Sequence, residues 1–255
     1  MKFSVLQFLG ELMLPLGVIC LLFAGYEAWW TNIEASQSQA QASSQLDAQW
    51  VNPRQKITPE LGDAFARLYI PTFGSDYEFA IVEGTSDADL LKGPGHYEDT
   101  EMPGEKGNFA VAGHRVGKGA PFNDLDNLNV CDTIVVETAG SWNIYKVLPM
   151  GADRAAEVSC LNPEQQQRVI DGDYAHVQGR HITDPGDYPV VHALPETDLV
   201  EPNDSLESLL TLTTCHPQFS AKERMIIHAM LVRQDPKTAG SLPPELAGPT
   251  AAQPA

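Results

Sequence analysis

The residue types needed for acyl transfer at a cysteine stand in two short motifs of this chain. Cys215 closes one apolar run, His114 follows another about a hundred residues earlier, and Arg224 lies nine residues beyond the cysteine. A thiolate can attack a carbonyl carbon, an imidazole can carry the proton, and a guanidinium can stabilise the oxyanion that forms. Their types and order therefore predict nucleophilic catalysis by Cys215, provided that the fold brings the three together.

Cys215 is predicted to lie at the end of a β-strand. Leucines and threonines alternate through residues 209–214, which gives the strand one apolar and one polar face. Pro217 has no N–H for the ladder and ends the strand, while the adjacent His216 faces away from the thiol. A lone cysteine is usually a small buried hydrophobe. The string Thr-Leu-Thr-Thr-Cys-His-Pro favours a nucleophile instead.

The candidate proton carrier and the candidate cation each have an ordinary alternative. His114 follows Gly113 at the end of an apolar run, but the chain has seven histidines, so a partner for the thiol is easily found by chance. Arg224 opens the last predicted strand, where its forked guanidinium suits a carbonyl oxygen better than lysine does. A surface pair with Glu223 is the alternative. The other histidines form no constellation and are interpreted as surface or satisfied core residues: His96, His176, His181, His192 and His228.

Residues 12–30 are apolar enough to cross a membrane. They form a stretch of 19 residues with one charge, and as a helix this stretch is roughly 28 Å long, about one hydrocarbon core. Tyr26, Trp29 and Trp30 are placed as an aromatic belt at the outer interface. Residues 1–11 carry a lysine and are predicted to be a short cytoplasmic segment. The chain is therefore expected in the cell membrane as a single-pass protein with its catalytic domain outside.

A cleavable signal peptide is the alternative reading of the same stretch. It requires small residues in an Ala-x-Ala pattern soon after the apolar run. The bulky Trp29 and Trp30 come before the nearest such pattern. An uncleaved anchor is therefore favoured.

Two polar segments flank the predicted folded domain at residues 62–236. Residues 31–61 are rich in Gln, Ser and Ala and are predicted to be a flexible stalk with at most transient helix. Residues 237–255 are rich in Pro and Ala and are predicted to be a disordered tail.

Short runs of β-branched and aromatic residues bounded by Gly, Pro or Asp predict an all-β domain. Short helices are expected after Thr85 or Ser86 and after Asn162, each a suitable N-cap. Many strands with few helices favour a closed or nearly closed barrel. The predicted strands are 68–70, 79–82, 108–112, 133–138, 142–147, 206–214 and 224–232.

Composition limits the partners. The chain has 16 basic and 34 acidic residues, a formal charge of −18, so it lacks the basic stripe that nucleic-acid binding needs. The acidity is interpreted as keeping an exposed domain soluble, with attraction of a cationic acceptor as the alternative. Residues 123–127 resemble a calcium loop but lack its glycine and its last glutamate, so neither a metal nor a cofactor is predicted.

The four cysteines divide by context. Cys20 lies in the apolar stretch and is expected to be inert. Cys131 and Cys160 lie in a domain expected outside the cell, where oxidation is allowed. A disulfide between them is a hypothesis, because the sequence does not show that their Cα atoms are close enough.

Longer strings around these motifs resemble the sortase family, and the resemblance runs from about residue 68 to 232. Ala-Gly-His-Arg and Thr-Leu-Thr-Thr-Cys-His-Pro-x-Phe-Ser-Ala-x-Glu-Arg are similar to its His and Cys–Arg motifs. The class E branch found in actinobacteria also shares Gly84, Leu90, Gly93-Pro94-Gly95-His96-Tyr97, Thr100, Pro103-Gly104-Glu105, Gly107-Asn108 and Gly119-Ala120-Pro121-Phe122.

The resemblance implies an eight-stranded β-barrel in which His114, Cys215 and Arg224 are the catalytic set. It also implies a sorting signal of the form Leu-Ala-x-Thr-Gly rather than Leu-Pro-x-Thr-Gly, cleaved between Thr and Gly through a thioester. A peptidoglycan-precursor amine would then accept the surface protein. Thr214 is a candidate substrate-binding residue. The segment 160–195 is longer than expected for the family, and is interpreted as a surface insertion or as a segment that reshapes the groove or contacts a partner.

Three other functions stay open. A pilin-polymerising sortase would use a protein lysine as its acceptor, but no lid segment with an Asp-Pro-aromatic anchor precedes the barrel. A cysteine hydrolase would use water. A non-catalytic, membrane-tethered binding module would keep the motif residues without turnover.

Overall fold

The computed structural model describes residues 5–51, 58–238, 240 and 242–247. Residues 1–4 of the predicted cytoplasmic segment, 52–57 of the predicted stalk, and 239, 241 and 248–255 of the predicted tail lie outside these residues.

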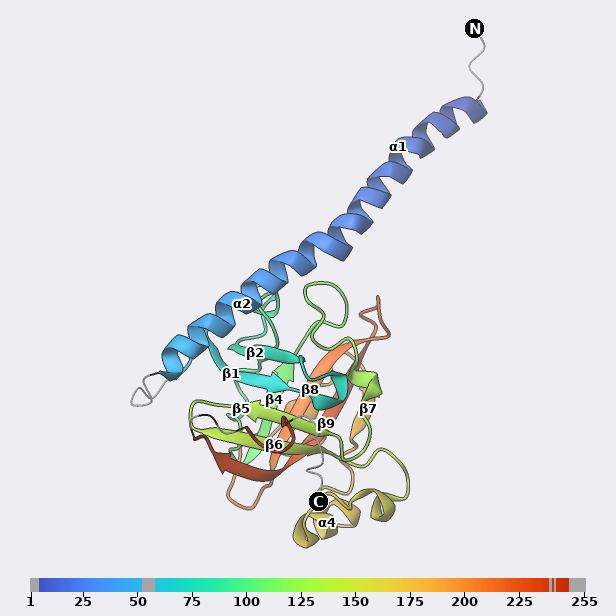
Figure 1. Ribbon diagram of the computed structural model, residues 1–255. Helices are drawn as coiled ribbons and strands as arrows, with labels where there is room; N and C mark the ends of the chain where they lie inside the picture. Colours follow the sequence, from blue (N-terminus) through green and yellow to red (C-terminus); the bar gives the residue numbers. More distant parts are fainter. Residues whose placement is uncertain (1–4, 52–57, 239, 241, 248–255) are drawn as a thin grey trace, which may run out of the picture.

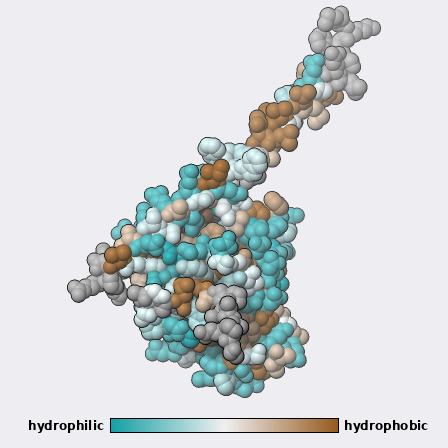
Figure 2. All heavy atoms as spheres, viewed as in Figure 1, coloured by the Kyte–Doolittle hydropathy of each residue, from teal (hydrophilic) through white to brown (hydrophobic). Residues whose placement is uncertain are grey.

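The N-terminal elements run on as a single rod (Figure 1). Helix α1 (Val5–Gly25) passes into a short π-helical turn, η1 (Tyr26–Trp30), and then into α2 (Thr31–Trp50), and the residues at both junctions keep right-handed helical angles. The window Phe8–Gly25 has a mean hydropathy of 2.1 and none of it is buried. Hydrophobic residues gather on the part of the rod that projects from the barrel, whereas the visible surface of the barrel is mostly hydrophilic (Figure 2). These features fit a single-pass membrane anchor.

The expectation of a flexible stalk is wrong for residues 31–50. They form α2, which packs against β1 (Ala64–Tyr69) and β2 (Glu78–Glu83). Ala42 and Leu46 are buried there in a small apolar cluster with residues of the two strands. The buried residues of α2 are Thr31, Ala35, Ala42 and Leu46, at spacings of four, seven and four residues. Residues at these spacings share one face of a helix. The Gln- and Ser-rich composition of the other faces hides this stripe.

Eight strands close into a barrel, as predicted. The hydrogen-bonded order is β6-β5-β1-β2-β3-β4-β8-β9, and pairing of β6 with β9 closes the ring, while β7 pairs with β9 outside it. The pairs β2–β3 and β4–β8 are parallel and the others are antiparallel. The bounds of the remaining strands are β3 (Gly95–His96), β4 (Gly107–Ala112), β5 (Thr133–Glu137), β6 (Ser141–Val147), β7 (Arg180–Thr183), β8 (Ser208–His216) and β9 (Glu223–Pro236).

Both expected short helices are present. Ser86 caps α3 (Asp87–Leu90) and Asn162 caps α4 (Pro163–Ile170), each through a reciprocal capping box. Short 3₁₀ turns complete the connections at η2 (Pro71–Phe73), η3 (Leu125–Asn127), η4 (Arg154–Glu157) and η5 (Tyr188–Val191).

The two largest of four apolar clusters among the described residues lie inside the barrel and beneath the insertion. The barrel interior holds the larger one, around residues such as Phe109 and Leu210. The insertion 160–195 supplies much of the second, in which Val169 of α4 and Tyr174 pack against Leu209 of β8. The insertion is therefore a folded layer that shares an apolar core with the outer face of the barrel.

The predicted disulfide between Cys131 and Cys160 is present, with 5.7 Å between the Cα atoms. It ties the turn before β5 to the connection that leads into α4. The insertion is thus held covalently to the barrel.

The first part of the predicted disordered tail is ordered. Lys237 lies 3.7 Å from the ring centroid of Trp50 and pairs with the buried carboxylate of Glu137. Farther along, Leu246 packs against the apolar cluster of Val135, Trp142 and Ile144, and Glu245 pairs with Arg233 at 2.7 Å. For the described residues of the tail, 237, 238, 240 and 242–247, the prediction of disorder is wrong, because Lys237, Glu245 and Leu246 anchor a segment whose composition is that of a linker.

Candidate active site

Strand register brings the two motifs to the same end of the barrel. In the antiparallel pair β8–β9, Cys215 lies directly opposite Arg224. In the parallel pair β4–β8, Ala112 lies beside Thr213, and the N–H of Gly113 donates to the Thr213 carbonyl at 3.0 Å. His114 therefore leaves β4 at the level where β8 presents the thiol.

Cys215 is a half-buried free thiol near the end of a rigid strand. The strand before it is buried on both faces, as expected for a strand with the barrel core on one side and covering segments on the other. Thr213 shares the face of Cys215 because successive side chains alternate. Thr213 and Arg224, the residue opposite Cys215 on β9, both line a cavity at this end of the barrel.

His114 is held in place by close backbone packing. A Cβ at Gly113 would come within 2.5 Å of the Phe122 ring, and the N–H of Phe122 donates to the His114 carbonyl at 3.0 Å. The imidazole Nε2 is buried and has no hydrogen-bond partner among the residues that the structure describes. Burial lowers the pKa of His114, the charge of Lys118 lowers it further, and Asp87 opposes both. The neutral imidazole therefore predominates at neutral pH.

Arg224 is half-buried and is not engaged by an acid. Its Nη1 donates to the backbone carbonyls of Ala221 and Glu223 at 3.3 and 3.1 Å. Within the described part of the chain it makes no ion pair with any carboxylate, so the surface pairing with the Glu223 side chain is not formed. Donors of the guanidinium therefore remain for a substrate oxygen.

Thr214 lies on the other face of β8 from Cys215. Its side chain is buried, and its hydroxyl donates to the carbonyl of Gly113 at 2.8 Å. This bond ties the segment that carries His114 to the strand that carries the thiol. The candidate substrate-binding residue is thus placed where it can position the histidine.

The comparisons with known proteins agree with this geometry. Residues 68–232 match the Sortase domain family. The chain belongs to the sortase family. Sortase SrtE1 from Streptomyces coelicolor is 35% identical over 91% of this chain, and the chain spans 58% of the length of that relative.

Solved structures give the same result for this sortase. The SrtF sortase from Corynebacterium diphtheriae is 63% identical, with a TM-score of 0.74, over 76% of this chain and 97% of that one. Sortase E1 from S. coelicolor, solved with a tripeptide in its active site, is 29% identical with a TM-score of 0.54, over 74% of this chain and 99% of that one. The class E resemblance is confirmed.

One wall of the groove in this sortase was not foreseen. Tyr97 lies with its hydroxyl 2.9 Å from Thr213 Oγ1. Burial raises the pKa of Tyr97, whereas the hydrogen bond with Thr213 and the charge of Arg224 lower it. A cavity beside it is lined by Tyr97, Arg224 and the segment 183–191. The insertion therefore shapes the groove next to Arg224. The string Gly-His-Tyr contained no chemical pattern that would have singled out this tyrosine.

The nearest histidine in sequence faces away from the thiol of this sortase, as expected. His216 Nδ1 accepts a hydrogen bond from Arg115 Nη1 at 2.7 Å, and Arg115 also pairs with Asp126 at 2.9 Å. Over the described residues, no group of three or more His, Cys, Asp or Glu side chains is arranged to hold a metal ion.

Proposed function

We propose that this sortase is a cysteine transpeptidase that cleaves a Leu-Ala-x-Thr-Gly-like sorting signal and transfers the surface protein to a cell-wall amine. The observation that carries the proposal is the β8–β9 register, which sets Cys215 opposite Arg224, together with the free donors of that arginine. The sorting signal is the one that the class E resemblance implies, and the tripeptide in the active site of S. coelicolor sortase E1 supports a short peptide ligand.

The proposed reaction has two acyl transfers. The Cys215 thiolate attacks the threonine carbonyl carbon, and the oxyanion accepts hydrogen bonds from Arg224 and from the backbone N–H after Cys215. The imidazolium of His114 protonates the departing glycine amine, which leaves a thioester. The acceptor amine then attacks the thioester, His114 takes its proton, and the thiolate leaves.

The lowered pKa of His114 affects the first of these two acyl transfers. Since the imidazolium must donate the first proton, the active fraction at neutral pH is limited by how much His114 is protonated while the thiol is ionised. Charged residues near His114 therefore affect the rate of thioester formation, because they change the fraction of His114 that is protonated.

The location is proposed with the function. The apolar helix spans the cell membrane through residues 12–30, with the N-terminus in the cytoplasm and the barrel outside. The catalytic domain then meets its partners at the cell surface.

Intact-mass analysis tests the proposed chemistry. The full chain in detergent micelles is mixed with a Leu-Ala-x-Thr-Gly peptide, and the expected adduct has the mass of the peptide minus its Gly end. Cys215→Ala is expected to abolish the adduct. The matched control is Cys20→Ala, which removes the other free cysteine and is expected to leave the adduct unchanged.

Two outcomes would contradict the proposal. An adduct that persists in Cys215→Ala would exclude this nucleophile. The sorting-signal assignment would be excluded if the protein formed no adduct and cleaved nothing with the Leu-Ala-x-Thr-Gly peptide and with a Leu-Pro-x-Thr-Gly peptide.

A further inference from the structure

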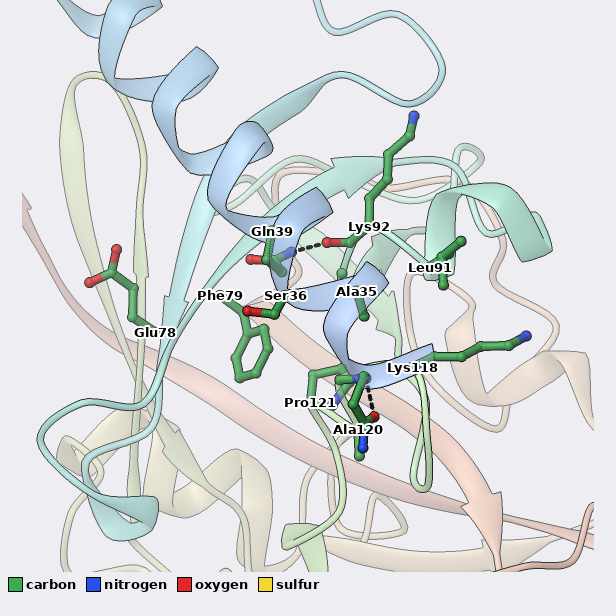
Figure 3. A pocket seen from close by; sticks show the side chains of 13 residues that line it. Ala35, Ser36, Gln39, Glu78, Phe79, Leu91, Lys92, Lys118, Ala120 and Pro121 are labelled. Carbon is green, nitrogen blue, oxygen red and sulfur yellow. Dashed lines mark hydrogen bonds between the residues drawn. The ribbon is translucent and has the colours of Figure 1, made fainter. Parts of the chain in front are cut away.

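The membrane-proximal end of α2 is bonded to the loop that follows His114. The N–H of Lys118 donates to Thr31 Oγ1 at 3.4 Å, and the N–H of Gly119 donates to Asn32 Oδ1 at 3.0 Å. A Cβ at Gly119 would lie 3.3 Å from the Cβ of Ala35, so helix and loop are in van der Waals contact. Figure 3 shows Ala35 and Ser36 of α2 over Ala120 of this loop.

Contacts farther along α2 fix the orientation of the whole barrel. The amide of Gln39 accepts from the N–H of Ala80 at 2.9 Å and donates to the Ala80 carbonyl at 3.1 Å, so it caps both polar groups of one β2 residue. Deeper in the contact, Leu46 is fully buried and Asp47 pairs with the buried Arg67 at 2.8 Å. Since α1 continues into α2 without a break, the barrel is held at one orientation to the anchor.

This orientation sets the height of the active-site end above the membrane. Thr31 and Asn32 come directly after Trp29 and Trp30, whose side chains are 79% and 61% exposed, as expected of an interfacial aromatic belt. The loop 117–120, bonded to these two polar residues, therefore lies within about one helical turn of the belt. The end of the barrel that bears His114 faces the bilayer.

A second loop at this end presents an unusually exposed aromatic ring. Residues 217–222 join β8 to β9, and in Figure 1 this orange loop projects from the end of the barrel at which α1 leaves. Gln218 Nε2 donates to Asn123 Oδ1 at 2.9 Å, which sets the loop beside the segment that follows His114. Phe219 is 88% exposed, more than any other large apolar side chain that the structure describes.

We propose that the 217–222 loop rests on the outer leaflet, with the Phe219 ring inserted into the lipid interface. The partner is the bilayer itself, and the proposal rests on the membrane placement of α1 given above. An aromatic ring is well suited to the headgroup region. The exposed Lys222 on the same loop adds a positive charge near the lipid phosphates, although the chain as a whole is strongly acidic.

Contact between the 217–222 loop and the lipid would fix the position of Cys215 and Arg224 relative to the membrane surface. The loop connects Cys215 to Arg224, so a loop seated in the interface holds the two groups directly above the lipid. A sorting signal or an acceptor that is itself attached to the membrane would then reach the thiol without leaving the surface.

Fluorescence at single labelled positions tests the proposal without relying on activity. The full chain carries Cys20→Ala and Cys215→Ala, so that Phe219→Cys introduces the only free thiol. This thiol is labelled with the fluorophore NBD. The labelled protein is then placed in nanodiscs of phosphatidylcholine and phosphatidylglycerol. The expected result is blue-shifted emission, several-fold weaker quenching by acrylamide than in the control, and quenching by lipids with a doxyl group near the headgroup.

The matched control is Glu164→Cys in the same background. Glu164 is exposed on α4, at the opposite end of the barrel from α1 in Figure 1. A label there is expected to show the emission of a fluorophore in water and strong quenching by acrylamide. Lys222→Cys is a second position on the loop, expected to behave like position 219.

A fourth protein separates the loop from the anchor. It keeps Cys20 as the labelled thiol, which lies in α1. If Cys20 reports lipid while positions 219 and 222 are as open to acrylamide as position 164, the loop proposal is overturned and the anchor stands. If Cys20 also reports water, the placement of α1 fails, and the loop proposal fails with it.

Discussion

At the scale of single residues, His114 lies between two opposite charges. Lys118, in the loop that follows it, lowers the pKa of the imidazole, and Asp87, in the first turn of α3, raises it, while burial has the largest effect. Neither charged residue belongs to the catalytic set. They offer a way to move the pKa of His114 in both directions without touching the groove.

Replacing these two residues is expected to shift the titration of His114 in opposite directions. Lys118→Gln removes a repelling positive charge, so the pKa rises towards the ordinary value of 6.5. Asp87→Asn removes an attracting negative charge, so the pKa falls further. The histidine ring shifts followed by NMR against pH measure both. A shift of the same sign in the two variants would contradict this electrostatic account.

His228 makes the native state sensitive to acid. It is fully buried, and burial lowers its pKa from 6.5 to about 3, with smaller effects of His181 and His176. The hydroxyl of Thr211 donates to Asn108, so its oxygen accepts from His228 Nδ1–H. The buried Nε2 has no hydrogen-bond partner among the described residues, so a second proton there would be unpaired. Native protein therefore resists the protonation that the unfolded chain accepts below the ordinary pKa.

The free energy of unfolding is expected to fall as the pH drops from about 6.5 towards about 3, by up to about 1.4 kcal/mol per pH unit from this residue. It is expected to be flat with respect to His228 above that window. His228→Asn keeps a donor to Thr211 and cannot titrate, so its urea midpoint should depend less on pH. An unchanged pH dependence in this variant would show that other groups cause the acid sensitivity.

The sequence was sufficient to propose His114, Cys215 and Arg224 as the catalytic set, because each stands next to a predicted strand and within a motif that resembles the family. It was not sufficient for Tyr97, whose partner Thr213 is 116 residues away. Nor did it show that the hydroxyl of Thr214 is bonded to Gly113. Such contacts depend on which strands become neighbours, and that is decided by the whole barrel.

At the scale of elements, strands were easier to predict than the helix that packs on them. The long, alternating strands were all found, although β1 begins four residues before the predicted start. The two-residue β3 and the four-residue β7 were missed because neither is long enough to show a period. Helix α2 was missed because small side chains and polar contacts hold it in place.

The buried Arg67 gives α2 an energetic role. Its guanidinium pairs with Asp47 at 2.8 Å, Glu78 at 3.0 Å and Glu137 at 3.5 Å, and it lies 5.1 Å from the ring centroid of Trp50. Two of these four partners, Asp47 and Trp50, belong to α2.

A chain that begins at residue 51 is expected to be less stable than one that begins at residue 31. It loses the α2 partners of Arg67 and exposes the Ala80 and Val82 surface, at a cost of about 1–3 kcal/mol. Urea unfolding of the two chains measures the difference. Asp47→Ala in the longer chain should reproduce part of the loss, whereas Gln45→Ala, on an exposed face of α2, should not. Equal midpoints for the two chains would show that α2 packs without stabilising the barrel.

At the scale of the whole molecule, charge and anchor have opposite effects at a membrane. The formal charge of −18 repels an anionic leaflet, and an aromatic contact such as Phe219 is too small to overcome this alone. Attachment therefore depends on α1.

The chain that begins at residue 31 is expected to stay in the supernatant when vesicles containing phosphatidylglycerol are sedimented. The full chain should sediment with them. Lowering the salt concentration should not recruit the shortened chain, because the long-range force is repulsive. Sedimentation of the shortened chain at low salt would contradict the charge argument.

The unbroken run of α1, η1 and α2 also holds the thiol at a constant height above the membrane surface. Because α2 is bonded along its length to the barrel, the thiol cannot swing to meet a target at another height. A membrane-attached target would then be selected by the number of residues between its cleavage motif and its own hydrophobic segment. Two signals of identical sequence but different spacing would be processed at different rates, and the encounter would depend on how densely they populate the surface rather than on their concentration in a volume.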